Sequence, residues 1–194
     1  MGRAGDFELL PAWLPSRPAD ALFDSLAADV PWTRHRLRMF GREVDAPRLS
    51  CWIGDPGIAY RYSGTRFAPQ PWPDALSAMR DAVSAEAGVA FNSVLANLYR
   101  DGRDAMGWHS DDEPELGPQP VIASLSLGAT RRFVLKARAP GAECVVERHV
   151  LELPHGSLLL MRGDCQARYR HALPRTAKQV GPRINLTFRK ILPI

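Results

Sequence analysis

The chain has 194 residues, of which 45% are hydrophobic and 24% are charged, a composition that suits one globular domain and excludes a disordered protein. No stretch reaches the roughly 18 consecutive apolar residues that a membrane span needs, and the N-terminal residues lack the apolar segment of a secretory signal. The formal net charge of +4 favours polyanionic partners, because Lys and Arg contacts to phosphates supply most non-specific affinity for nucleic acids.

The three cysteines, Cys51, Cys144 and Cys165, are widely spaced along the chain. An odd number of cysteines at such spacing indicates neither a disulfide framework nor a cysteine-rich zinc site. We therefore expect a protein of the reducing cytoplasm.

Two helices are predicted in the N-terminal half of the chain. The first covers residues 16–30, with Ser16 as its cap, and the second covers residues 73–87 and ends before Gly88. Each carries apolar side chains at helical spacing, which we expect in the core: Leu22, Phe23, Leu26 and Val30 in the first helix, and Trp72, Leu76, Met79 and Val83 in the second.

Short β-strands separated by Gly, Pro and Asp clusters are predicted for the rest of the chain. Residues 37–40 and 49–53 are expected to form a hairpin. Further strands are predicted at residues 58–62, 93–99, 121–127, 132–136, 145–153, 157–161 and 184–188. Two helices followed by many short strands predict a mainly β (α+β) protein, a two-sheet jelly roll with both N-terminal helices packed on one sheet.

A histidine and a carboxylate stand two residues apart at His109 and Asp111. On an extended segment these side chains point to the same face and can reach one metal ion. His171 is the best candidate for a third ligand, with His149 and His155 as rivals. Two histidines and one carboxylate on one face of an iron ion leave three positions open, enough for a bidentate 2-oxo acid and oxygen.

Polar and apolar residues alternate near the C-terminus, where Arg183, Asn185, Thr187 and Arg189 share one face of a predicted strand. An inward-facing arginine captures a carboxylate through two parallel hydrogen bonds, and a dicarboxylate such as 2-oxoglutarate needs capture at both ends. Asn97 and Tyr99 offer a second polar pair on the strand that leads toward His109.

The chain resembles the AlkB family of nucleic-acid dealkylases from about residue 37 to 192. The resemblance rests on three elements that occur in the family's order and at its spacing: N-x-Y, H-x-D with a later His, and R-x-N-x-x-x-R. The resemblance implies a double-stranded β-helix. It implies that iron(II) is bound by His109, Asp111 and His171, and that 2-oxoglutarate is held by Asn97, Tyr99, Arg183, Asn185 and Arg189. Arg189 is counted with the catalytic residues.

The resemblance also implies an activity, the oxidative demethylation of N1-methyladenine and N3-methylcytosine with O2, releasing formaldehyde, succinate and CO2. Glu113 follows Asp111 by two residues, so we expect its carboxylate to accept a hydrogen bond from the exocyclic amine of the base. The family places an aromatic side chain at the position of Tyr62 to stack on the flipped base. Met39 and Phe40 resemble the apolar tip of the finger hairpin in members that act on duplex DNA. Met39 stands where a smaller aliphatic residue is expected, so duplex DNA, single-stranded DNA and RNA all stay open as substrates.

We expect residues 1–194 to form a single dioxygenase domain that acts as a monomer away from membranes. Residues 1–92 contribute the helices and the recognition hairpin, and residues 93–192 contribute the catalytic jelly roll. The alternatives are a 2-oxoglutarate oxygenase that acts on a protein or small molecule, a non-catalytic nucleic-acid-binding jelly roll, and a metal-dependent hydrolase.

Overall fold

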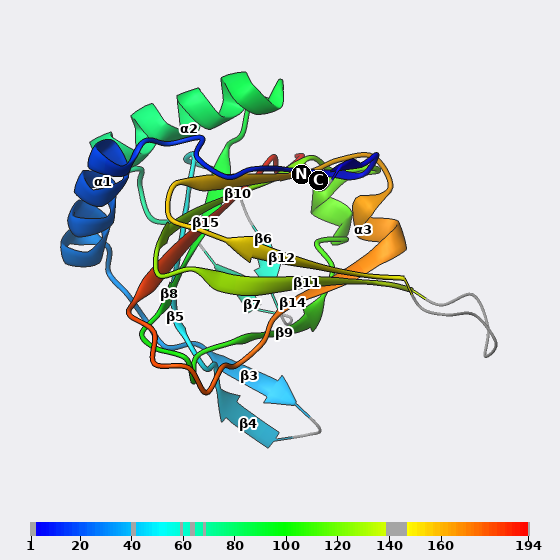
Figure 1. The fold of residues 1–194 in the computed structure, drawn as a ribbon. Coiled ribbons are helices and arrows are strands. Elements are labelled where there is room, and N and C mark those ends of the chain that lie inside the picture. The colour runs from blue at the N-terminus through cyan, green and yellow to red at the C-terminus, as the bar shows by residue number, and fades with distance from the viewer. Residues whose placement is uncertain are drawn as a thin grey trace.

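The computed structural model describes residues 3–39, 42–58, 60–62, 65–67, 69–138 and 147–193. Two antiparallel sheets face each other and form the predicted jelly roll (Figure 1). The larger sheet has seven strands in the order β1 (Arg3–Ala4), β2 (Phe7–Leu10), β13 (Ser157–Met161), β10 (Ile122–Gly128), β15 (Arg183–Arg189), β8 (Ser93–Tyr99) and β5 (Leu49–Gly54). The smaller sheet has four strands in the order β12 (Arg148–Leu153), β11 (Arg131–Ala137), β14 (Tyr169–Leu173) and β9 (Met106–His109).

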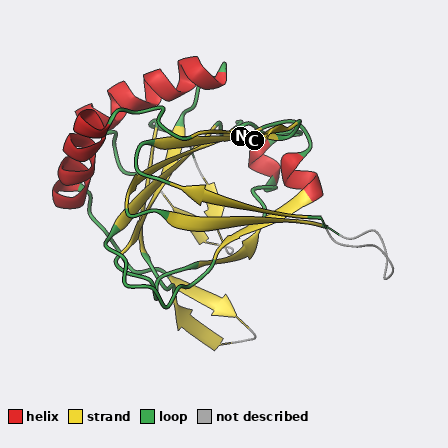
Figure 2. Ribbon diagram, in the orientation of Figure 1, coloured by secondary structure: helices red, strands yellow, loops and turns green. Residues whose placement is uncertain are grey.

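The two predicted helices correspond to α1 (Ser16–Asp29) and α2 (Asp74–Ala87), and both lie on the outer side of the seven-stranded sheet (Figure 2). Their predicted apolar faces enter the core, where Leu22, Leu26, Leu76 and Val83 are buried. The prediction that Ser16 caps α1 was wrong. Pro15 occupies the cap position, and no side chain accepts a hydrogen bond from the first turn.

The strand β15 lies at the centre of the larger sheet, between β10 and β8, and is buried on both faces. Ile184, Leu186 and Phe188 are fully buried in the apolar cluster beneath the helices. The alternating residues, from Arg183 to Arg189, therefore face the four-stranded sheet. This alternation places polar groups between the two sheets, where a site can be shielded from water.

Two small hairpins accompany the sheets. The first pairs β3 (Arg36–Met39) with β4 (Arg42–Asp45) and projects from the body, as Figure 1 shows. The predicted pairing of residues 37–40 with residues 49–53 was therefore wrong. The apolar strand β5 joins the core sheet beside β8 instead, because Cys51 and Ile53 are buried there. The second hairpin pairs β6 (Tyr60–Tyr62) with β7 (Thr65–Phe67).

The remaining elements are short. The 3-10 helix η1 (Pro114–Leu116) follows the predicted metal-binding loop, and α3 (Cys165–Arg168) precedes β14. The sequence patterns did not predict β1, β2, β4, β7, β9 or β14. Phe40 and Cys144 lie outside the described residues, as do the first two residues of the strand predicted at 145–153. Within the described ranges, no helix has the length and apolar character needed to cross a membrane.

Candidate active site

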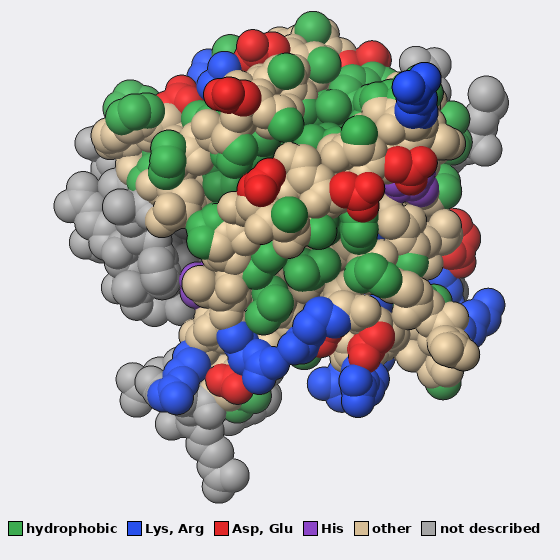
Figure 3. Space-filling model, turned by 90° about the vertical axis from the view of Figure 1, so that its left-hand side faces the viewer, with side chains coloured by type: hydrophobic (Ala, Val, Ile, Leu, Met, Phe, Trp, Pro, Cys, Tyr) green, Lys and Arg blue, Asp and Glu red, His purple; other side chains and the backbone are tan. Residues whose placement is uncertain are grey.

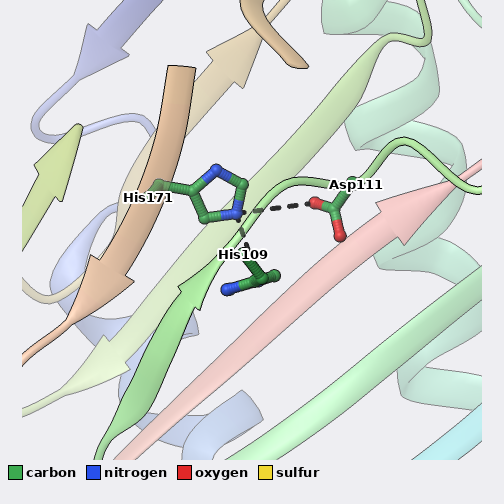
Figure 4. A group of neighbouring side chains, drawn as sticks. All are labelled: His109, Asp111 and His171. Atoms are coloured by element: carbon green, nitrogen blue, oxygen red, sulfur yellow. Dashed lines mark hydrogen bonds and ion pairs between the residues drawn. The ribbon is translucent and has the colours of Figure 1, made fainter. Parts of the chain in front are cut away.

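The three predicted metal ligands converge at one end of the space between the sheets. His109 ends β9 and lies directly opposite His171 on β14, and Asp111 follows two residues after His109. The Nε2 atoms of the two histidines are 3.2 Å apart, and the Nε2 of His171 lies 3.8 Å from Oδ2 of Asp111 (Figure 4). All three ligand atoms lie within 4.8 Å of one another, and no other such cluster of His, Cys, Asp or Glu occurs among the described residues.

The local environment sets the protonation states that metal binding requires. The Nδ1–H of His109 donates to the carbonyl of Gly107 at 2.8 Å, and Nε2 is the ring nitrogen that faces His171. Burial lowers the pKa of His171 to about 3, so its imidazole is neutral at pH 7. Burial alone would raise the pKa of Asp111, but Arg189, His171 and His109 together outweigh burial, and the pKa is lowered to about 2.

This donor set fits iron(II), because one carboxylate and two neutral imidazoles on one side of the ion leave coordination positions for a 2-oxo acid. The rival ligands His149 and His155 are engaged elsewhere. His155 accepts the N–H of Gly128 through Nδ1 at 2.8 Å. The Nε2 of His149 lies 2.7 Å from a carboxylate oxygen of Glu147.

The predicted co-substrate residues line the same pocket as the metal ligands. On the seven-stranded sheet, β15 pairs Arg183 with Tyr99 and Asn185 with Asn97 of β8. The cross-strand neighbours thus build one continuous polar wall. The pocket is lined by these four residues, Thr187, Arg189, Ser124 and the three metal ligands, together with the apolar side chains of Met106, Phe133, Met161 and Leu173.

Arg183 is the strongest sign of an anionic ligand. Its side chain is 1% exposed, and its only hydrogen bond among the described residues runs from Nη2 to Oγ of Ser126 at 2.9 Å. The Nε and Nη1 atoms are buried and have no hydrogen-bond partner there. Burial lowers the pKa of Arg183 to about 10, so the group still carries its charge at pH 7. A buried cation with two unsatisfied donors fits a carboxylate that accepts both.

Arg189 connects the polar residues of β15 with the predicted metal ligands. Its Nη2 donates to Oδ1 of Asp111 at 2.6 Å. With Oδ1 held in this way, Oδ2 is the oxygen that faces His171 and is available to a metal ion. The side chain therefore orients the carboxylate ligand from the opposite sheet.

The sequence analysis missed several residues that hold the site together. The amide of Asn185 donates to Oγ of Ser124 at 2.8 Å, and the alternating serines of β10 were a pattern that pointed to this face. Arg48 donates through Nε to Oδ1 of Asn97 at 2.8 Å. Gln166 accepts the backbone N–H of Asp111 through Oε1 at 3.0 Å. Neither Arg48 nor Gln166 belonged to a recognisable motif.

The predicted substrate-contacting residues are less fully described. Glu113 is half-buried and precedes η1, two residues beyond Asp111. Met39 ends β3 and Tyr62 ends β6, but the described structure does not include their side chains, and Phe40 lies outside it. Their contacts with a base stay predictions.

Comparison with known proteins agrees with this geometry. The sequence profile of the 2OG-Fe(II) oxygenase superfamily matches residues 6–189. The alpha-ketoglutarate-dependent dioxygenase alkB homolog 3 of Homo sapiens is 40% identical over 190 residues, which are 95% of this chain and 66% of that protein. The DNA oxidative demethylase ALKBH2 of Homo sapiens is 42% identical over 182 residues, 90% of this chain and 69% of that protein.

Among solved structures, that of OsALKBH1 superposes with a TM-score of 0.67 at 19% identity, covering 98% of this chain and 100% of the other, which shows a shared fold. The chain spans about two thirds of the length of the alkB homolog 3 proteins. The profile match and the identity to ALKBH2 establish the relationship. The chain belongs to the 2OG-Fe(II) oxygenase superfamily and, within it, to the AlkB family that its motifs resemble.

Proposed function

We propose that this protein is an oxidative demethylase that repairs N1-methyladenine and N3-methylcytosine in DNA with iron(II), 2-oxoglutarate and O2. One observation carries the oxygenase chemistry. The trio of His109, Asp111 and His171 shares a pocket with the buried, incompletely paired guanidinium of Arg183. A metal site and a carboxylate site in one enclosed space are what a 2-oxo acid oxygenase needs.

The side chains of the two sheets divide the work. Arg183 binds the carboxylate of 2-oxoglutarate that lies far from the metal, and Arg189 holds Asp111 in its ligand orientation. When bound, iron(II) would supply the O2 chemistry: one oxygen atom of O2 would oxidise the N-methyl group, whose carbon leaves as formaldehyde, and the other would enter 2-oxoglutarate, which loses CO2 to become succinate. The burial of Asp111 and His171 excludes bulk water from this reaction.

DNA as the substrate is supported by the relatives, because the ALKBH2 proteins of human, bovine and mouse origin are named DNA oxidative demethylases. The net charge of +4 agrees with a polyanionic partner. Glu113 is proposed to accept from the exocyclic amine of the base, Tyr62 to stack on it, and Met39 and Phe40 to form the hairpin tip that meets the nucleic acid.

We further propose a monomeric, cytoplasmic protein with one dioxygenase domain over residues 1–194. The N-terminal residues, 1–92, and the catalytic residues, 93–192, both contribute strands to the seven-stranded sheet. There β5 and β2 from the N-terminal residues pair with β8 and β13 from the catalytic residues. This interleaving favours one cooperative unit.

The test is mass spectrometry of oligonucleotides that carry one N1-methyladenine or N3-methylcytosine, incubated with the protein, iron(II), 2-oxoglutarate and air. We expect the methyl mass to disappear from DNA, and to persist when 2-oxoglutarate is omitted. Parallel reactions on single-stranded DNA, duplex DNA and RNA rank the substrates. Persistence of the methyl group on all three, with 2-oxoglutarate still bound, would overturn the demethylase assignment and leave an oxygenase with another substrate.

A further inference from the structure

A groove of about 550 Å³ lies on the outer side of the four-stranded sheet, between β9, β14 and the base of the β3–β4 hairpin. Its lining includes Val44, Pro47, Trp108 and Val134. Met106 and His109 line both this groove and the active-site pocket. The groove therefore begins at the strand that carries a metal ligand.

Trp108 differs from the other four tryptophans of the chain. It is 42% exposed, whereas the others are half-buried. Trp13, Trp32 and Trp72 donate their indole N–H groups to oxygen acceptors within the fold, but that of Trp108 meets no acceptor among the described residues. Val44, also in the groove, is 48% exposed. Core packing thus does not explain Trp108, and the exposed apolar surface that it shares with Val44 makes the groove a candidate binding site.

The charge around the groove is positive. Arg148 and Arg175 line it, and neither forms an ion pair with a described residue. Lys136 lies directly between Arg148 on β12 and Arg170 on β14, although like charges opposite each other destabilise a sheet. Asp45, the carboxylate among the described lining residues, lies 3.4 Å from Arg34. On the adjoining face of the molecule, Lys and Arg side chains gather toward the same lower end (Figure 3).

Strand geometry relates this groove to the reaction. Neighbouring side chains on a strand point to opposite faces, so His109 faces the pocket and Trp108 faces the groove. The strand β9 is the edge strand nearest the hairpin (Figure 1). If a target base entered the pocket beside His109, the adjoining nucleotides of the nucleic acid would stay outside the pocket, next to β9. An exposed aromatic ring beside arginines that pair with no described carboxylate fits stacked bases and their phosphates.

We propose that this groove binds nucleotides that flank the target base, with Trp108 stacking on a base and Arg148 and Arg175 contacting phosphates. The inference rests on the proposed function, because it concerns the strand that presents the damaged base. A protein partner would use the apolar surface without the phosphate contacts, and the experiment separates the two.

The test compares Trp108→Ala and Trp108→Phe with Leu192→Ala, a control at an exposed apolar side chain outside the groove. Fluorescence anisotropy measures the Kd for an unmethylated, labelled single-stranded 11-mer, which requires no catalysis. We expect Trp108→Ala to raise that Kd about tenfold and Trp108→Phe to raise it less than about threefold, because a phenyl ring still stacks. Leu192→Ala should match wild type.

Two further readouts separate stacking from a structural defect. The kcat/KM for a methylated trimer, too short to fill the groove, and 2-oxoglutarate consumption without nucleic acid should be unchanged in Trp108→Ala. Arg148→Gln should reduce the slope of log Kd against log salt concentration by about 0.7, the value for one lost phosphate contact on a single strand.

A wild-type Kd for the 11-mer in Trp108→Ala would overturn the inference. So would a fall in kcat/KM for the trimer as large, in fold-change, as the rise in Kd for the 11-mer. Failure of the proposed function is a different result. The wild-type protein would then demethylate no oligonucleotide, whatever the anisotropy shows.

Discussion

The two sheets contribute to the site in different ways. The residues proposed to bind 2-oxoglutarate lie on β15 and β8, inner strands of the larger sheet, and neighbours on β10 such as Ser124 and Ser126 hold their polar groups. The proposed metal ligands lie on and beside the smaller sheet, where β9 is an edge strand and Asp111 lies in a loop. Sheet register fixes the polar residues of the larger sheet and the two histidines of the smaller one, whereas individual hydrogen bonds from Gln166 and Arg189 hold Asp111. Substitutions on the two sheets should therefore change different binding constants.

The largest effect is expected for Asp111→Ala. Removing the carboxylate takes away one of three ligands, so metal affinity should fall by more than the roughly 100-fold that follows loss of a ligand's hydrogen-bond partner. Titration with cobalt(II), followed by absorption, measures this affinity. The matched control is Asp112→Ala, because Asp112 is exposed and bonds to Arg138 instead. Equal metal affinity in the two variants would remove Asp111 from the site.

On the opposite sheet, Arg183→Met should raise the KM for 2-oxoglutarate about 100-fold and leave cobalt(II) affinity unchanged, because each charge-assisted hydrogen bond contributes about 1.5–3 kcal/mol. Without 2-oxoglutarate, the free energy of unfolding should not fall, since a buried, incompletely paired charge is removed.

Arg131→Met is the comparison for Arg183→Met. Arg131 is also buried, but it donates to the backbone carbonyls of Asp101, Asp104 and Pro174. Its loss should lower the free energy of unfolding by about 3 kcal/mol, as measured by urea denaturation. If Arg183→Met were the more destabilised of the two variants, Arg183 would be a structural residue and not a carboxylate receptor.

Gln166→Met should lower cobalt(II) affinity about tenfold, an intermediate effect. Gln166 is buried, accepts the backbone N–H of Asp111, and lies on α3, immediately before the strand of His171. Methionine fills a similar volume but leaves that N–H without its acceptor, so the carboxylate ligand is less well positioned. A changed cobalt(II) absorption spectrum would accompany the loss. An unchanged spectrum and affinity would show that Gln166 does not position Asp111.

Glu113→Gln should have the smallest effect, about a fivefold fall in kcat/KM for methylated oligonucleotides. Its carboxylate is proposed to accept a hydrogen bond from the base, worth about 1 kcal/mol net. Metal affinity and the KM for 2-oxoglutarate should not change. Cobalt(II) titration measures metal affinity, and steady-state kinetics measure kcat/KM for the oligonucleotide and the KM for 2-oxoglutarate. A rise in the KM for 2-oxoglutarate alone would place Glu113 on the co-substrate side.

The sequence predicted the fold and the residues that line the pocket better than the hydrogen bonds that position those residues. Alternation along β15 was sufficient to assign one face to Arg183 and Asn185, because the period of a strand is fixed. The partner of the hairpin strand β3 was mispredicted, since apolar spacing does not distinguish a strand in the core sheet from one in a surface hairpin. Arg48 and Gln166 were missed because their partners lie 49 and 55 residues away in the chain.

The most direct test of the demethylase assignment is to quantify formaldehyde, succinate and demethylated base in one reaction on an oligonucleotide with a single N1-methyladenine. We predict equal amounts of all three from the wild-type protein and none from Asp111→Ala. Succinate formed without loss of the methyl group, or loss of the methyl group without succinate, would contradict the account.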